Sequence, residues 1–266
     1  MTIAIARALI VLVAFVAAAA SHAAATLETI TGDVRVGRNT AIAVPARATQ
    51  TVATDNVVTT GPKSRATLRF TDGSGVALYE NAEFRISDYA FSRENPAGDR
   101  SRFELLKGAM RAVTGLLGQR SPNAYSVRTP QATIGIRGTD FMLAVVNPLF
   151  FQILNGSISV VNSAGAPVFA SGAIGTVAAD GTLALTIAPG ALPAGVVQAF
   201  NQLSVLNLAS LVPAPGPATP AALPAGFGAV AIPGAILIGI GVAVAGGGDD
   251  DAAGTGTVTG TGTGTR

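Results

Sequence analysis

The sequence contains no cysteine and no tryptophan, and its single histidine is His22. Without cysteine the chain has no disulfide, no thiolate nucleophile and no cysteine-ligated metal. If an N-terminal signal that includes His22 is removed, the mature chain has no histidine for a catalytic triad, a metal site or a pH switch. Charged residues make up only 12% of the chain and form no basic stripe, so nothing in the sequence indicates nucleic-acid binding.

Residues 1–25 have the pattern of a secretory signal. Arg7 supplies the positive start, an apolar run extends from Ala8 to Ala20, and the small residues up to Ala25 offer cleavage sites. The apolar run is short for a membrane-spanning helix. We therefore expect export with cleavage near Ala25, and an uncleaved anchor helix is the alternative.

Between residues 26 and 190 the apolar side chains recur with a period of two, which is typical of β-strands. The clearest strand is Arg65 to Phe70, whose alternate residues are apolar. Many short strands separated by polar turns predict an all-β domain, either a β-sandwich, a barrel or an irregular β-helix (solenoid). The dipeptide Asn155-Gly156 predicts a hairpin between strands at 150–154 and 157–161.

The chain is organised differently after residue 190. Apolar residues with a helical period predict one helix within residues 191–212, and prolines predict an extended linker over 213–226. Residues 227–245 are an uncharged run as long as a bilayer span, so we expect this C-terminal apolar segment to be a transmembrane helix. A segment that folds back on the β-domain or stays in solution is the alternative. The Gly- and Thr-rich tail, residues 246–266, is of low complexity and has no means of forming a core.

Three motifs stand in a specific order within the β-domain. The first comprises Thr60-Gly61, Ser64-Arg65-Ala66, Leu68, Phe70, Asp72-Gly73-Ser74 and Leu78. The second comprises Leu106, Gly108, Met110-Arg111, Val113, Thr114 and Gly115. The third, which we call the signature, is Thr129-Pro130 followed by Ala132-Thr133-Ile134-Gly135-Ile136-Arg137-Gly138-Thr139-Asp140-Phe141. Together they resemble the FecR-domain family, over roughly Leu27 to Asp180.

That family is typified by the iron-dicitrate sensor, which controls a sigma factor from the bacterial envelope. The resemblance implies an all-β domain and a role in envelope sensing and control of gene expression. The sensor pattern begins with a cytoplasmic anti-sigma segment, whereas the first apolar stretch here starts at Ala8, so we expect a stand-alone domain. We expect it to be periplasmic, anchored in the inner membrane through 227–245, and to bind another envelope protein. A structural or adhesion-type scaffold is the alternative.

Within the signature, two strands are expected to meet at a bend that Gly135 and Gly138 permit. Pro130 lacks an N–H donor and is expected at a strand start or edge. Arg137 is interpreted as pinning the bend by hydrogen bonds to carbonyls and to Asp140, and contact with an anion or partner is the alternative. The structural role predicts that Arg137→Ala destabilises the domain more than loss of an exposed arginine.

The remaining polar residues do not suggest an active site. No two carboxylates have a spacing that fixes them together, and Asp72-Gly73-Ser74-Gly75 is neither a phosphate loop nor a calcium loop. We therefore expect no enzymatic activity, no cofactor and no metal. Residues expected on outward faces of strands are Arg65, Arg69, Tyr79 and Arg85. We expect a solvated sheet face there, and a receptive patch is the alternative.

Overall fold

The computed structural model describes residues 23–178 and 181–208, which belong to one structural unit. The predicted linker, the 227–245 segment, the tail and most of the predicted signal lie outside the described residues. Among the helices that the model describes, none has the length and apolarity needed to cross a bilayer. The described residues form a single mixed sheet of fifteen strands, in which β9 and β10 are the parallel pair, so the predicted all-β class is confirmed.

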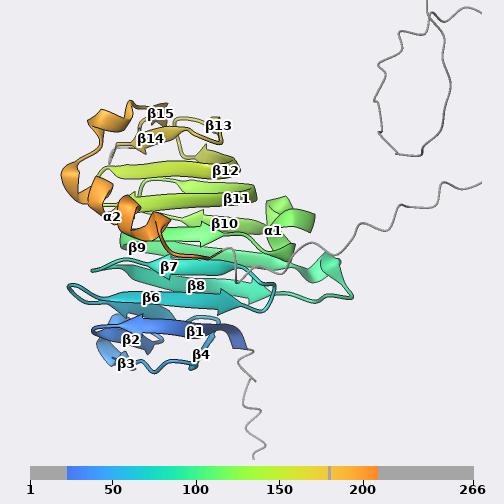
Figure 1. Ribbon diagram of the computed structural model, residues 1–266. Coiled ribbons are helices and arrows are strands. Elements are labelled where there is room, and N and C mark those ends of the chain that lie inside the picture. Colours follow the sequence, from blue (N-terminus) through green and yellow to red (C-terminus); the bar gives the residue numbers. More distant parts are fainter. Residues whose placement is uncertain (1–22, 179–180, 209–266) are drawn as a thin grey trace, which may run out of the picture. The chain divides into compact units, whose positions relative to one another are not determined.

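The elements follow one another from β1 at the N-terminal end to α2 at the C-terminal end (Figure 1). The strands are β1 (Ala23–Thr31), β2 (Val34–Gly37), β3 (Val44–Pro45), β4 (Thr51–Ala53), β5 (Val57–Thr60), β6 (Arg65–Phe70), β7 (Gly75–Leu78), β8 (Glu83–Ala90), β9 (Arg100–Val113), β10 (Tyr125–Arg128), β11 (Thr133–Val145), β12 (Leu149–Val161), β13 (Val168–Ala170), β14 (Ile174–Val177) and β15 (Leu185–Thr186). The α-helices are α1 (Leu116–Arg120) and α2 (Ala194–Ser204).

Three long strands, β9, β11 and β12, each contain a glycine with positive φ. These are Gly108 at 81°, Gly138 at 54° and Gly156 at 80°. Before its glycine, β9 pairs with β8 and β10, and after it β9 pairs with β7 and β11. Because only glycine adopts positive φ without steric cost, these positions let one strand serve two layers. The sheet is therefore folded over itself.

We name the two layers by what covers them. The helix-covered layer, against which α2 packs, consists of β4, β1, β6, β7, β14 and β15 with residues 108–113 of β9, 140–145 of β11 and 149–155 of β12. The open layer consists of β3, β2, β5, β8, β10 and β13 with residues 100–107 of β9, 133–137 of β11 and 157–161 of β12.

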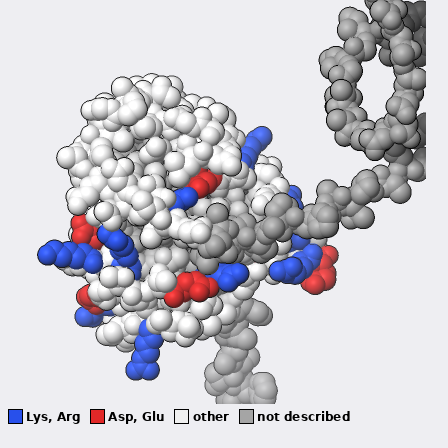
Figure 2. Space-filling model, in the orientation of Figure 1, with Lys and Arg blue, Asp and Glu red and all other residues white. Residues whose placement is uncertain are grey.

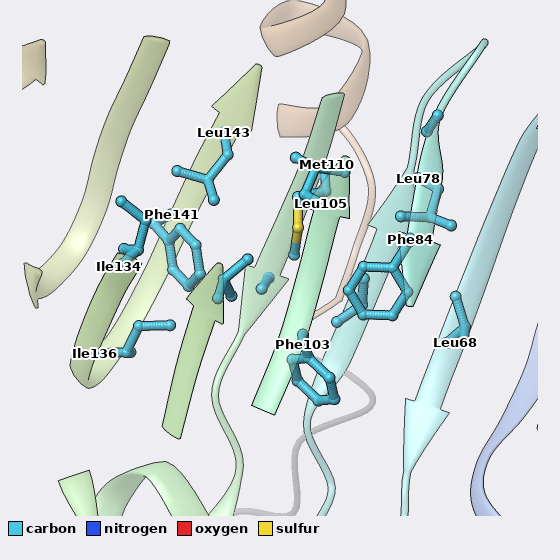
Figure 3. Packing of buried hydrophobic residues seen from close by; sticks show 14 of the residues in the cluster. Leu68, Leu78, Phe84, Phe103, Leu105, Met110, Ile134, Ile136, Phe141 and Leu143 are labelled. Atoms are coloured by element: carbon cyan, nitrogen blue, oxygen red, sulfur yellow. The ribbon is translucent and has the colours of Figure 1, made fainter. Parts of the chain in front are cut away.

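The main core lies between the layers. Figure 3 shows Phe84 and Phe103 of the open layer gathered in one cluster with Met110 and Phe141 of the helix-covered layer. The period-two prediction is confirmed in β6, where the alternate residues Ala66, Leu68 and Phe70 are buried. It also holds in β11, whose inward side chains from both halves of the strand are Ile134, Ile136, Phe141, Leu143 and Val145.

The predicted hairpin at Asn155-Gly156 is wrong. Both flanking runs belong to the single strand β12, and Gly156 bends it beside the bend of β11. The turn between β11 and β12 instead contains Asn147, whose φ is 56°. An Asn-Gly pair indicates a backbone position with positive φ. Such a position occurs at a bend inside a strand as well as in a hairpin turn.

Candidate functional site

The signature begins with a tight turn that starts β11. The amide of Thr129 donates to the carbonyl of Ala132 at 2.8 Å, and its hydroxyl accepts from the amide of Ala132 at 3.1 Å. Pro130 lies within this turn, exposed and ahead of β11, where its missing donor is not needed. Gly135 lies further along, opposite Ser126 of β10 and Ser159 of β12.

At the bend itself, the signature is tied to the second motif. The amide of Thr139 donates to the hydroxyl of Thr114 at 2.8 Å, and the amide of Thr114 donates to the carbonyl of Thr139 at 3.0 Å. Both residues are buried, so these bonds fix the strand as it leaves Gly138.

Asp140 pairs with Arg111 of the second motif and not with Arg137. Nε of Arg111 lies 2.9 Å from Oδ1 of Asp140, and Nη2 lies 2.7 Å from Oδ2, which is a bidentate ion pair. Arg137 is exposed and has no hydrogen bond or ion pair to any described residue. The expected pinning of the bend by Arg137 is therefore corrected: β9 and β11 lie side by side, and this places Arg111 next to Asp140.

The same guanidinium holds the end of α2. Nη1 of Arg111 donates to the carbonyls of Leu203 at 3.1 Å, Ser204 at 2.9 Å and Leu206 at 2.8 Å. The last carbonyls of a helix have no partner within the helix and carry partial negative charge. Arg111 supplies hydrogen-bond donors to these carbonyls. The Arg111 side chain is only 10% exposed, and Asp140 balances its charge.

The four outward residues Arg65, Arg69, Tyr79 and Arg85 do not form the alternative receptive patch. Arg65 donates to Oε1 of Gln202 on α2 at 2.8 Å and lies 5.5 Å from the ring of Tyr79. Arg69 lies near Glu28 of β1 on the same layer. Arg85 belongs to the open layer, where it lies 3.6 Å from Glu104.

A buried polar network joins the first motif to the second around Asp72. Oδ1 of Asp72 accepts from the amide of Ser74 at 3.0 Å and from the hydroxyl of Tyr89 at 3.1 Å. Oδ2 accepts from the hydroxyl of Ser74 at 2.7 Å and from the amide of Leu117 at 3.3 Å. The hydroxyl of Ser74 in turn accepts from the amide of Gly115 at 2.9 Å. The Asp-Gly-Ser stretch is therefore a turn, and its side chains hold the two motifs together.

Two tyrosines near this network are held in their neutral form. Burial, followed by the carboxylate of Asp72, raises the pKa of the Tyr89 hydroxyl. The same two causes raise the pKa of Tyr125 well above its ordinary value. The hydroxyl of Tyr125 has no hydrogen-bond partner among the described residues. Neither tyrosine is therefore available as a base or nucleophile near neutral pH.

The outer face of the open layer carries the exposed part of the signature. Arg137 of β11 and Arg128 of β10 are both exposed, and neither forms an ion pair with a described residue. The other arginines on strands of this layer lie next to carboxylates: Arg35, Arg85, Arg100 and Arg102. Between Arg128 and Arg137 lies a strip of small side chains that pair across strands: Ser126, Gly135 and Ser159.

Sequence reasoning missed Arg111 as the centre of the site. The spacing in the chain gave no sign that it meets Asp140, which lies 29 positions later, or Leu203, 92 positions later. Within the described ranges, no group of acidic side chains is arranged to hold a metal ion. The residues of the site fix the bend of β11 and hold the end of α2, which are structural tasks. They also leave Arg128 and Arg137 exposed, which is suited to binding.

The fold and the site define an all-β domain whose motifs hold the sheet together and support a helix. The family model described as FecR protein matches residues 56–159. The resemblance drawn from the three motifs is thus confirmed over these residues. The matched range includes Arg111, Asp140 and Arg137 but not α2.

Comparison with solved structures finds similar chains from Parabacteroides distasonis ATCC 8503. Two crystal structures, each described as "a putative anti-sigma factor", align at 14% and 16% identity with TM-scores of 0.41 and 0.43. The alignments cover 49% and 55% of this chain. They span 58% and 64% of the solved chains, which is less than two thirds of their length. Comparison with curated proteins finds no match.

Proposed function

We propose that this protein is an exported FecR-type module of the bacterial envelope that works by binding another envelope protein in a signalling role. The observation that carries the proposal is the exposed face of the signature strands. Neither Arg137 nor Arg128 forms an ion pair with a described residue; Glu104, which lies opposite Arg128 on β9, pairs with Arg85. The small side chains beside Gly135 leave room for a partner to approach. Arginines without an ion pair favour an acidic partner surface and raise its association rate.

Charge reversal tests this contact. The double variant Arg128→Glu and Arg137→Glu is compared with the matched variant Arg38→Glu and Arg47→Glu, which changes two exposed arginines at the other end of the sheet. Envelope proteins are cross-linked in cells and the partners captured by the wild-type chain are identified. We expect a partner to be lost, by about tenfold or more, only from the first double variant. Equal capture by both variants would refute the assigned surface.

Transcription separates signalling from a structural role. If the protein signals, its deletion changes transcription of neighbouring genes, and Arg128→Glu with Arg137→Glu reproduces that change. A structural scaffold is the second candidate, favoured by exposed apolar side chains on the last strands, such as Val161, Val168 and Leu185. Figure 2 shows that the part of the visible face above α2 carries almost no charge. Loss of envelope integrity without a transcriptional change would support the scaffold.

Export is part of the proposal. Residues 1–25 carry the signal pattern, and β1 already begins at Ala23, with Ala24 and Ala25 only 1% and 2% exposed. Cleavage after Ala23 leaves both buried alanines in β1, whereas cleavage after Ala25 removes them. We therefore expect the mature protein to start at Ala24, and N-terminal sequencing of envelope protein checks this. A chain that still starts at Met1 or Thr2 would contradict export with cleavage.

Membrane attachment through 227–245 is the last part of the proposal. The uncharged length of this segment supports it. Carbonate extraction of the full chain is compared with that of a chain ending at Val212. We expect the full chain to stay in the pellet and the shorter chain to be released. Release of both chains would reject the anchor.

A further inference from the structure

Helix α2 covers an apolar cluster that is separate from the main core. Its floor on the helix-covered layer is formed by Ala77, Ala109, Met142, Ala144 and Phe150. Its cover is formed by Val196, Ala199, Phe200, Leu203 and Leu208. Because the floor residues point away from the space between the layers, opening this contact leaves the main core closed.

The helix is weak without this contact. It has eleven residues, its N-cap is Pro193 with no side-chain cap, and its first turn contains no acidic residue. Gly195, Val196 and Val197 also have low helix propensity. Isolated helices shorter than about 12–15 residues are marginal in water. The helix therefore forms while it is docked, and undocking is expected to unfold it.

The N-terminal half of α2 borders an open pocket. The pocket has a volume of about 260 Å³ and is lined by residues that include Gly195, Val196, Gly108 and Ala144. On the side of the pocket the helix has fewer packing partners, which reduces the dispersion energy that holds it there. The firm attachment is at the other end, where Arg111 donates to three backbone carbonyls.

That attachment depends on the signature bend. Asp140 fixes the orientation of the Arg111 guanidinium through two bonds of 2.9 Å and 2.7 Å, leaving Nη1 directed at α2. Arg137 and Gly138, on the exposed bend, immediately precede Thr139 and Asp140. A displacement of the bend would therefore alter the hydrogen bonds from Arg111 to the end of α2.

We infer that α2 is a releasable strap. It detaches from the helix-covered layer as a unit while the two-layer core stays folded. The Arg111–Asp140 ion pair sets the equilibrium between the docked and the released helix. The inference goes beyond the proposed function and needs no partner. Release uncovers the apolar floor and the guanidinium of Arg111 together, in the same place. The strap therefore links the state of the signature bend to the part of the chain that follows Leu208.

Hydrogen exchange of the full chain, read from peptides by mass spectrometry, tests the strap. In the wild type we expect amides of residues 196–204 to exchange at least about tenfold faster than those of β11 and β12, because local opening precedes global unfolding. Asp140→Asn weakens the grip on Arg111, so exchange in 196–204 should rise about ten- to hundredfold with β11 and β12 unchanged.

Two further variants keep the test decisive. Leu203→Ala removes a fully buried contact of α2 without touching the ion pair, and Val205→Ala changes a neighbouring side chain that is 78% exposed. We expect faster exchange in 196–204 for the first and wild-type exchange for the second. A common exchange rate for α2 and the strands in every variant would show that the helix opens only by global unfolding, and would overturn the inference. Faster exchange in Leu203→Ala but not in Asp140→Asn would overturn the role of the ion pair.

Discussion

The carboxylate of Asp72 is the strongest single test of how the motifs hold the sheet. Asp72 is fully buried and accepts four hydrogen bonds, two of them from the backbone amides of Ser74 and Leu117. Asp72→Ala leaves those two amides and two hydroxyl donors without this acceptor. We expect it to separate the first motif from the second and to loosen the end of the two-layer sheet where α1 lies.

The magnitude follows from the lost acceptor. Each buried donor left unpaired costs about 1–3 kcal/mol, and the two orphaned amides set the lower limit. We therefore expect Asp72→Ala to lower the free energy of unfolding by about 2–6 kcal/mol. Domains of this kind are stable by about 5–15 kcal/mol, so the loss is a large fraction of the total.

Urea unfolding of the full chain, followed by far-UV circular dichroism, measures this loss. The midpoint should fall while the slope stays constant, since the same surface is exposed on unfolding. Asp33→Ala is the control: its side chain is 59% exposed and pairs with Arg35 at 3.3 Å, so its effect should stay within about 0.5 kcal/mol. An effect of Asp72→Ala as small as the control would refute the view that this network holds the two motifs together.

Other substitutions test the remaining contacts. Tyr89→Phe loses its bond to Asp72 and should cost about 1–2 kcal/mol, whereas Tyr125→Phe removes an unpaired hydroxyl and should be neutral or stabilising in the same urea experiment. The pKa of both tyrosines is raised in the folded state, so their ionisation does not lower the free energy of unfolding below pH about 10. Above that pH the free energy of unfolding should fall by about 1.4 kcal/mol per pH unit for each tyrosine. Urea titrations at several pH values check this. Arg111→Ala leaves Asp140 without its cation and should cost about 3–5 kcal/mol, while Arg137→Ala should stay within about 0.5 kcal/mol; equal thermal melts would contradict the ion-pair assignment. Gly156→Ala places a side chain at positive φ against the backbone of β11 and should lower the melting temperature by several degrees, and an unchanged melt would show that the bend is not strained.

Local pattern was enough to predict which residues form strands. In β6 and β11 the alternation of apolar residues sets which side chains face the core, because side-chain direction has a period of two along any strand. The helix at α2 was predicted from its apolar period: Val196, Phe200 and Leu203 are buried on one face, and the helix ends at Ser204. The motifs were also enough to predict the match to the FecR model over residues 56–159.

Only the tertiary structure decided which polar residues work together. Arg137 looked like the partner of Asp140 because it is three residues away, but β9 places Arg111 beside Asp140 instead. Gly156 looked like a hairpin turn, but the neighbouring bend at Gly138 makes it a bend within β12. The sequence determined the strands and their inward faces, because these depend on neighbours along the chain. Pairings across the folded sheet, and the docking of α2 on it, depend on how distant strands align, and spacing along the chain does not carry that information.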